Sequence, residues 1–570
     1  MFNNDPLSID DILENYEITL PQVKDLIKKG FLLEEKTIQS RIKERVINQD
    51  FVSHSFKNKT EFNQAWLNHK PILFIPKDIQ EDEDTLLDLC KDTILKKQRI
   101  VIFCPEILTT YKYASLIKKY LNINTACINS NLSDSEYYDY YQAIRNNEYD
   151  CIVTSQKGIF LPFQNVGLYY LLNEDSDNYY SDQSPRYDLH HILIYLSRTS
   201  NANLVMSSLV PSVNSYCNGL KQYFNIIDHS QSSNNKKIEL VNMIDELKEG
   251  NTSFISNKLN KVINNIDKQQ PINHNLLLIL NNKNYSSHVL CRDCGEVSKC
   301  ERCNVSLNYH EKGGYLVCPS CNKHYEFNNE CLKCHSKNLL FGGIGIELLW
   351  KNLDKIAATN QYHKWVIDEN NFELLNEIHS SFDEYPYNIV ISTDSISKSM
   401  PTNFFDNVSI INFDSSLKAP SFDAGSRCYS MLENATSLLN DKGSLIIQTS
   451  NPTHYVIKSF LDHNYKAFIK EELALRKLQN NIPYKRINRI IIKAKYEEMF
   501  KVANTIKSTL ISNHDYNIFV LGPTYSKKEM GAVLLIKHNS KEINKIYKNI
   551  YELYQNTNVT IIFDKHPRSL

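Results

Sequence analysis

The sequence predicts an α/β protein with two lobes, the second of which carries a double Cys₄ zinc-binding insert. Three observations predict this fold. Short apolar runs alternate with helical stretches between residues 70 and 230, the alternation returns from residue 276, and four C-x-x-C pairs interrupt this second stretch. Such alternation is typical of a mostly parallel sheet with helices packed on its faces.

Composition narrows the class of protein. The chain has 570 residues, of which 42% are hydrophobic and 23% charged, as in globular proteins with several domains. The formal net charge is −1, so a nucleic-acid site must be a local patch. The first residues, MFNNDPLSIDD, are polar and acidic, and no run of about 18 apolar residues occurs. We therefore expect a cytoplasmic protein with no membrane span, whose thiols outside the insert are reduced.

The cysteine pairs of the insert predict a metal centre. Two thiolates separated by two residues can hold one ion, and two such pairs complete a tetrahedral site with no position open to water. We expect two structural zinc ions, held by Cys291, Cys294, Cys300, Cys303, Cys318, Cys321, Cys331 and Cys334. Spacing leaves the pairing open, because sequential pairs or nested pairs can each share an ion.

Residues 1–50 predict a small helical module. Ser8 and Asp11 fit a helix start, and LPQVKDLIKKG has helical periodicity and stops at Gly30. Helix, turn, helix and a strand-like tail form a winged-helix pattern, which often binds DNA. The alternative is a packing module that does not contact DNA.

The lobes follow in order along the chain. Residues 51–235 form the first lobe, and its predicted strands are PILFIP, RIVIFCP, TACINS, DCIVTS, LYYLLN and NLVMSSL. Residues 236–455 form the second lobe, with strands at LLLILN, HKWVID, YNIVIST, VSIINFD and SLIIQTS and the zinc insert at 288–338. Residues 456–570 predict a smaller α+β domain, with strands at RIIIKAK, IFVLG, AVLLIK and TIIFD and amphipathic helices at EEMFKVANTIKSTLI and KEINKIYKNIYELYQ.

The cysteine stretch, from LLLILNNKNYSSHV through CPSC, resembles the primosomal protein N-prime family, the PriA replication-restart DNA helicases of superfamily two. CPEILTT, GIFLPFQNVGL, SPRYDLHH and GGIGIELL are similar to further segments of that family, as are FIKEELALR and the ending D-x-x-P-x-x-L. The resemblance implies a winged-helix remnant, two RecA-like helicase lobes and a C-terminal domain. It also implies nested zinc pairing, with Cys291, Cys294, Cys331 and Cys334 around one ion and Cys300, Cys303, Cys318 and Cys321 around the other.

Positions that contact nucleotide in this family are altered here. No G-x-x-x-x-G-K-[ST] phosphate loop occurs, and its place holds PKDIQEDEDT, which has no glycine and whose carboxylates would repel a triphosphate. The family's DEEH motif falls at residues 173–176, where Glu174 is kept and the metal-binding Asp is replaced by Asn173. SATPS reads SLVPS at residues 208–212.

Two further motifs are altered in the second lobe. The fifth motif reads STDSISKS, which keeps Lys398 and loses both glycines, and no arginine lies between Arg427 and Arg476, where the sixth motif should supply one. Because phosphoryl transfer depends on these positioned groups, we expect no catalytic residues, only the remnants Glu174 and Lys398. ATP hydrolysis should be absent or very weak. The alternative is that a diverged pocket still binds ATP and Mg²⁺.

Three hypotheses of function follow. The first is an adaptor that binds forked or single-stranded DNA and recruits primosome and other replication proteins without hydrolysing ATP. The second is a working 3′-to-5′ helicase with a diverged site, and the third is a zinc-stabilised scaffold that binds only protein. The missing phosphate loop favours the first over the second. Basic residues interleave with aromatics in the insert, a pattern that suits single-stranded DNA, although the aromatics can instead fill the small core.

Overall fold

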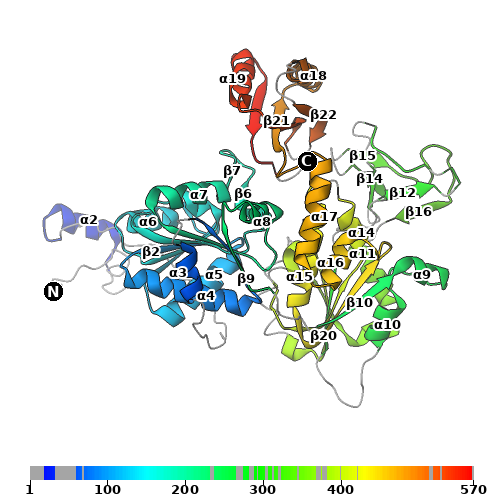
Figure 1. Ribbon diagram of the computed structural model, residues 1–570, viewed down its shortest axis with the longest axis horizontal. Coiled ribbons are helices and arrows are strands. Elements are labelled where there is room, and N and C mark those ends of the chain that lie inside the picture. The colour runs from blue at the N-terminus through cyan, green and yellow to red at the C-terminus, as the bar shows by residue number, and fades with distance from the viewer. Residues whose placement is uncertain are drawn as a thin grey trace.

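The computed structural model describes most of the chain (Figure 1). The described residues are 18–32, 59–66, 70–230, 236–264, 274–280, 288–342, 346–367, 374, 382–512 and 518–567, with short gaps at 292, 295, 302–305, 311–313, 319–322, 398–399, 420 and 527–528. Within residues 1–50, the structure describes helix α2 (Leu20–Lys28), which ends before Gly30 at φ +76°. The rest of the predicted winged helix lies outside the described residues.

The first lobe is built on a seven-stranded sheet in the order β3-β4-β2-β5-β8-β1-β9, in which every neighbouring pair is parallel. Its strands are β1 (Ile72–Ile75), β2 (Arg99–Phe103), β3 (Thr125–Ile128), β4 (Cys151–Thr154), β5 (Val166–Leu171), β8 (Asn203–Ser207) and β9 (Asn225–Asp228). All six predicted strands are confirmed. Most of their residues are apolar because helices cover both faces of the sheet.

The helices of the first lobe divide between the two faces. The helices α3 (Lys59–Trp66), α4 (Ile79–Leu95) and α5 (Ile107–Leu121) pack on one face, and α6 (Asp134–Arg145), α7 (Leu189–Ser200) and α8 (Val213–Leu220) pack on the other. A short hairpin, β6 (Tyr180–Ser181) and β7 (Tyr187–Asp188), precedes α7. This is the two-sided layering that the alternation of strands and helices predicts.

The second lobe is built on a parallel six-stranded sheet in the order β10-β20-β19-β11-β18-β17. Its strands are β10 (Lys237–Asn242), β11 (His274–Ile279), β17 (His363–Ile367), β18 (Tyr387–Ser392), β19 (Phe405–Ile410) and β20 (Leu439–Thr449). The helices α10 (Asn257–Asn264) and α11 (Ile346–Asp354) cover one face. The helices α15 (Ala424–Ser437), α16 (Tyr455–Leu461) and α17 (Tyr465–Leu478) cover the other.

The C-terminal part is a four-stranded antiparallel sheet backed by two helices, seen at the top of Figure 1. Its strands are β21 (Arg486–Lys493), β22 (Phe519–Ser526), β23 (Gly531–His538) and β24 (Thr560–Asp564), and its helices are α18 (Tyr496–Ser512) and α19 (Ile543–Tyr554). All four strands and both helices were predicted from the sequence. Among the described residues, no helix is both long and apolar enough to cross a bilayer.

A buried ionic network joins the C-terminal sheet to the hairpin of the first lobe. Arg186 of the hairpin lies 2.6 Å from Glu529, and Arg489 donates to Asp564 at 2.8 Å. Tyr180 donates its hydroxyl to the same Asp564 carboxylate at 2.5 Å. Charged hydrogen bonds of this kind are geometrically demanding, so the network fixes the orientation of the C-terminal sheet on the first lobe.

Candidate metal centre and interlobe contacts

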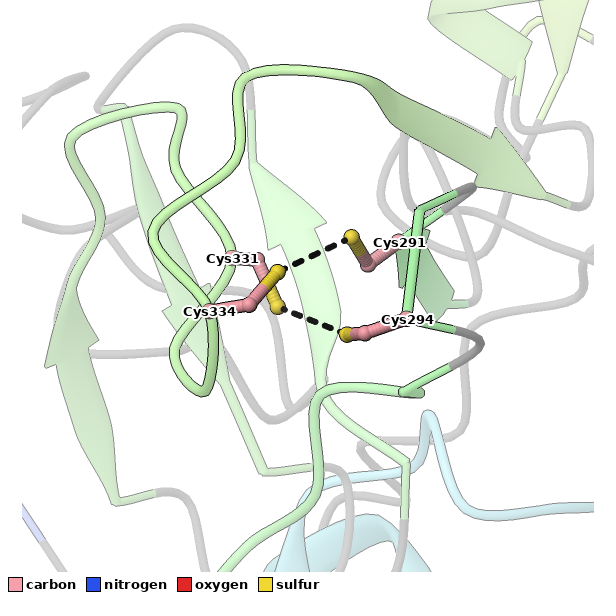
Figure 2. Close-up of side chains that lie close together, drawn as sticks. All are labelled: Cys291, Cys294, Cys331 and Cys334. Carbon is pink, nitrogen blue, oxygen red and sulfur yellow. Dashed lines mark hydrogen bonds between the residues drawn. The ribbon is translucent and has the colours of Figure 1, made fainter.

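Four cysteine sulfurs meet between two loops of the insert (Figure 2). Strand β12 (His288–Cys291) pairs antiparallel with β16 (Leu339–Gly342), which brings the loop after Cys291 beside the loop that precedes β16. The Cys291 and Cys334 sulfurs lie 3.5 Å apart, the Cys294 and Cys331 sulfurs lie 3.6 Å apart, and all four lie within 4.8 Å of one another.

These separations fit a metal site and exclude disulfides. A disulfide requires about 2.05 Å between sulfurs. Four sulfurs at about 2.3 Å from one tetrahedral zinc ion lie about 3.8 Å from one another. The four thiols of the outer pairs can therefore hold a metal ion, and they are the set that nested pairing puts around one ion.

Backbone hydrogen bonds hold the two turns in a conformation that points the four thiols toward one another. The Cys291 and Cys331 amides donate to the carbonyls of Glu296 and Ser336, each at 2.8 Å, and so close the two knuckle turns. The amide of Lys333 donates to the Cys331 sulfur at 3.4 Å. Donation from backbone N–H groups, first that of Cys294, lowers the pKa of the Cys291 thiol to about 7. Such donation favours the Cys291 thiolate, which is the form that binds metal. Backbone hydrogen bonds act in the same direction on Cys294 and Cys334, but hydrogen bonds with the neighbouring sulfurs outweigh them and raise the pKa of both thiols.

A second cluster of side chains in the insert surrounds the inner cysteines. Cys300 and Cys318 are described and buried, whereas Cys303 and Cys321 lie outside the described residues. A small core contains these two thiols together with Tyr309 and Phe327. Those two aromatic rings fill the core, as the sequence allowed, and they are not free to stack on a ligand.

Two other aromatics of the insert remain partly open to solvent. Tyr315 stacks on His324 with ring centroids 5.0 Å apart, across neighbouring strands β14 (Tyr315–Val317) and β15 (His324–Glu326). On the same three-stranded sheet, Lys323 lies over the Tyr325 ring at 4.6 Å. The hydroxyl of Tyr325 donates to the Cys300 sulfur at 3.1 Å, which ties this surface to the inner cysteines.

The loop between β1 and α4 is where the resemblance to the helicase family places a phosphate loop. Asp78 begins α4 and accepts from the Glu81 amide at 2.8 Å, while the Glu81 carboxylate accepts from the Lys77 amide at 2.8 Å. The carboxylates of the chain itself therefore occupy the amide groups that a phosphate would need at this helix start. His229 approaches the same Glu81 carboxylate at 3.1 Å.

Asp82, one turn into α4, points inward. Its carboxylate accepts from Tyr170 at 2.5 Å and from Ser207 at 3.0 Å. Burial raises its pKa to about 7, although both hydrogen bonds act in the opposite direction. Part of the acidic stretch that the sequence contains here is therefore buried and hydrogen-bonded inside the first lobe.

Glu174, which the resemblance predicts to be a remnant of the family's DEEH motif, is fully buried. One carboxylate oxygen accepts from the Ser212 amide at 2.5 Å. The other accepts from the Ser212 hydroxyl at 3.0 Å and from the Ser215 hydroxyl at 2.8 Å, and lies 3.2 Å from His190 Nε2. Burial alone would raise the pKa of Glu174, but these donors, His190 first among them, hold it below its usual value.

His190 completes this buried cluster. Its Nδ1 lies 2.7 Å from Asp188, and its Nε2 also lies 2.8 Å from the Glu174 carbonyl oxygen. Burial lowers the pKa of His190, but the two carboxylates outweigh burial and raise it to about 10. A charged imidazolium therefore sits between Asp188 and Glu174. His190 was not predicted as a site residue, although it lies in SPRYDLHH, a segment that is similar to one of the helicase family.

The two lobes touch directly, and the contacts on the first-lobe side come from residues 175–177 and from Pro211. Asp175 accepts from Ser208 at 2.7 Å in its own lobe and from Ser430 of α15 at 2.9 Å in the other. Arg427, also on α15, lies 3.3 Å from Asp177 of the first lobe. The Tyr465 hydroxyl donates to the Pro211 carbonyl. Lys398, the other predicted remnant, lies outside the described residues.

A cavity of 420 Å³ remains between the lobes beside these contacts. Its charged lining is dominated by acid: the carboxylates are Glu106, Asp175, Asp177, Asp394 and Asp423, and the cations are Arg427 and Arg476. Arg476 is buried and donates to Glu472 at 2.7 Å, so its charge is already paired. A triphosphate would meet net negative charge in this cavity.

In sequence, the chain is similar to replication restart proteins from several bacteria. No protein-family model matches the chain. The chain is 26% identical to "Replication restart protein PriA" of Bacillus subtilis over 501 residues, covering 84% of this chain and 62% of that protein. It is 27% identical to the PriA protein of Borreliella burgdorferi over 495 residues, covering 82% of this chain and 73% of that protein. The chain thus spans a little under two thirds of the length of the Bacillus relative.

Similarity to solved structures is weaker. The chain matches the helicase MrfA bound to DNA with a TM-score of 0.42 and 7% identity, covering 73% of this chain and 48% of that one. It matches RecG bound to a three-way DNA junction with a TM-score of 0.41 and 10% identity, covering 81% and 50%. The sequence similarity to these two PriA replication restart proteins extends over more than four fifths of the chain.

Proposed function

We propose that this chain is a replication-restart protein that binds forked or single-stranded DNA and recruits replication proteins, and that it does so without hydrolysing ATP. The PriA relatives support the replication-restart and DNA-binding role. The burial of Glu174 supports the absence of hydrolysis and is the observation on which the proposal chiefly rests.

A motor of this family needs a carboxylate that orients water toward the γ-phosphate. In this chain every oxygen of the Glu174 carboxylate accepts from Ser212, Ser215 or His190 inside the first lobe. Freeing it would leave an imidazolium and two hydroxyls without their acceptor in a dry environment, which is costly. We infer that Glu174 has become a structural residue that joins the end of β5 to the start of α8.

We infer that the insert holds two structural zinc ions, each with four thiolate ligands. The outer ligands are Cys291, Cys294, Cys331 and Cys334, and their separations fit the bond lengths of zinc. The inner ligands are Cys300, Cys303, Cys318 and Cys321. Such ions would supply no chemistry to a reaction. They would hold the knuckles and the β13–β15 sheet in place, β13 being Asn308–His310.

We infer that this sheet is one contact for single-stranded DNA. Tyr315, His324 and Tyr325 offer rings, and Lys323 lies beside them. Bases stack on such rings whatever their sequence, and lysines meet the backbone. Lys323 also lies 2.7 Å from Glu301, so its charge is partly used within the insert and stacking should contribute more than charge.

We further propose four functional parts: the module at 1–50, the lobes at 51–235 and 236–455, and the C-terminal part from 456. In this division, α16 and α17 begin the C-terminal part in sequence, although their apolar faces pack into the core shared with the lobes. The chain would act in the cytoplasm, where DNA and replication proteins are found.

Binding to a fluorescently labelled DNA fork tests this proposal, measured by anisotropy across a salt series with and without a non-hydrolysable ATP analogue. We expect binding that weakens steeply with salt and does not change with the analogue. A protein-only scaffold would give no binding to the fork at low salt. A working motor would give binding that depends on the analogue.

A further inference from the structure

Strand β10 lies at one edge of the six-stranded sheet and presents an unused edge. Among the described residues it pairs with β20 alone, through six consecutive register positions from Lys237 to Asn242. None of its residues is fully buried, although its neighbours in the sheet are. An edge strand with free backbone groups is a template for an added strand, unless another segment of the chain covers it.

The helix after this strand is equally uncovered. Helix α9 (Met243–Lys248) has no buried residue. Two of its apolar side chains face solvent, with Ile244 45% and Leu247 59% exposed. Isolated exposed leucines are common, but here two apolar side chains lie next to an unpaired strand edge.

A groove of 540 Å³ runs between the strand and the helix. Four consecutive strand residues, from Glu239 to Asn242, line one wall. This wall amounts to about 13 Å of extended chain. Residues of α9 and its C-terminal end line the other wall. The shape is therefore long enough for an extended segment, and the strand edge supplies backbone groups along it.

The charged side chains around the groove indicate which kind of segment can bind there. The lining carries the carboxylates of Glu239, Asp245, Glu246 and Glu249 against the single cation of Lys258. Lys258 and Lys237 both approach Glu239, at 2.6 Å and 2.8 Å, and Lys248 pairs with Asp245 at 3.0 Å. No described residue forms an ion pair or hydrogen bond with the exposed Glu249 carboxylate, so negative charge remains at the open end. Such a surface repels nucleic acid.

We infer that this groove receives an extended basic segment of a partner protein, which adds to β10 as a further strand of the sheet. Backbone hydrogen bonds to the strand edge would supply affinity. Lysine or arginine side chains beside Asp245 and Glu249 would make the groove bind basic segments more tightly than acidic ones. Apolar residues of the segment would cover Ile244 and Leu247. The groove is built from residues other than those that carry the DNA-binding proposal, so either proposal can fail alone.

The probe for this inference is a fluorescein-labelled octapeptide of alternating lysine and valine, titrated with the full-length zinc-loaded chain. Two control peptides accompany it: one alternates glutamate and valine, and the other is the lysine peptide with methylated backbone nitrogens. The groove variant is Asp245→Lys with Glu249→Lys. The matched control is Glu497→Lys with Glu498→Lys on α18, which makes the same change of charge at exposed positions of the C-terminal part.

We expect the lysine peptide to bind, and the groove variant and the methylated peptide each to weaken binding by about tenfold or more. The α18 variant should bind as the wild type does. Amide exchange at residues 238–242 should slow when the peptide is present. No binding, equal loss in both variants, or equal binding of the methylated peptide would overturn the inference. So would exchange at β10 that is already slow in the free chain, because the edge would then be covered by this chain.

Discussion

Ser430 of α15 donates its hydroxyl to Asp175 of the first lobe at 2.9 Å, and this hydrogen bond joins the segment at residues 173–176 to a helix of the second lobe. Two further contacts lie beside it: Arg427 lies near Asp177, and Tyr465 packs between Tyr216 and Tyr429. Protein groups therefore join the two lobes directly.

Removing the Asp175 contact should loosen this arrangement. Asp175→Ala removes the acceptor of both Ser208 and Ser430 and should lower the free energy of unfolding by about 2 kcal/mol, since both bonds are to a charged group. Ser430→Ala should cost less, and the double variant should show coupling between the two positions. Urea unfolding of the four proteins measures this coupling. Strictly additive losses would mean that the interlobe bond does not persist in solution.

The Glu174–His190 pair predicts a distinctive pH dependence. The pKa of His190 is raised from 6.5 to about 10, so the folded chain holds this proton more tightly than the unfolded chain does. Its stabilisation is complete below the unfolded pKa of 6.5 and is lost as the pH rises toward 10. His190→Asn should therefore cost about 3 kcal/mol near neutral or slightly acid pH and much less in alkaline solution. Denaturant midpoints of both proteins across that range test it, and a constant difference would contradict a charged His190.

The pairing of the cysteines predicts how many zinc ions a cysteine variant retains. Wild type should contain two zinc ions per chain by elemental analysis of the purified protein. Under nested pairing, Cys291 and Cys331 bind the same ion, so the double variant Cys291→Ser with Cys331→Ser should keep one. Sequential pairing would put these residues in different sites, and the same variant would keep none. Cys127→Ser, outside the insert, is the matched control and should keep both.

The stacked rings of the insert predict a contribution to DNA binding. Tyr315→Ala should weaken binding to single-stranded DNA by about 1–3 kcal/mol if one base stacks on this ring. Its effect should change little with salt, because no charge is removed. Tyr138→Ala on α6 removes a ring that is 54% exposed on the first lobe and should leave binding unchanged. Equal effects from the two substitutions would remove the insert from the DNA surface.

The strands, helices and cysteine pairs that were predicted correctly are those whose pattern is visible in a short stretch of sequence. Central strands such as β2 and β5 are covered on both faces and therefore read as unbroken apolar runs. Helices α5 and α18 have the expected period. Strands β9 and β10 were not predicted because edge strands bury less, and their residues are more polar. Cysteine pairs were recognised because metal ligands impose a fixed spacing.

The surroundings of Glu174 could not be predicted in the same way. Its partners come from two separate segments, His190 at the start of α7 and Ser212 and Ser215 at the start of α8, and only the folded chain brings them together. The sequence indicated that the motif was damaged. It did not indicate that the surviving glutamate had been enclosed. The contact between Asp175 and Ser430 was hidden for the same reason, since 255 positions separate the two residues.

The most direct test of the account is ATP hydrolysis by the zinc-loaded chain in the presence of forked DNA, beside a Glu174→Gln variant that has been shown to fold. We predict that the fork binds and that phosphate release stays at background in both proteins. Phosphate release that the fork stimulates and that Glu174→Gln abolishes would show that Glu174 leaves its buried partners to act on nucleotide. The chain would then be a working helicase with a diverged site.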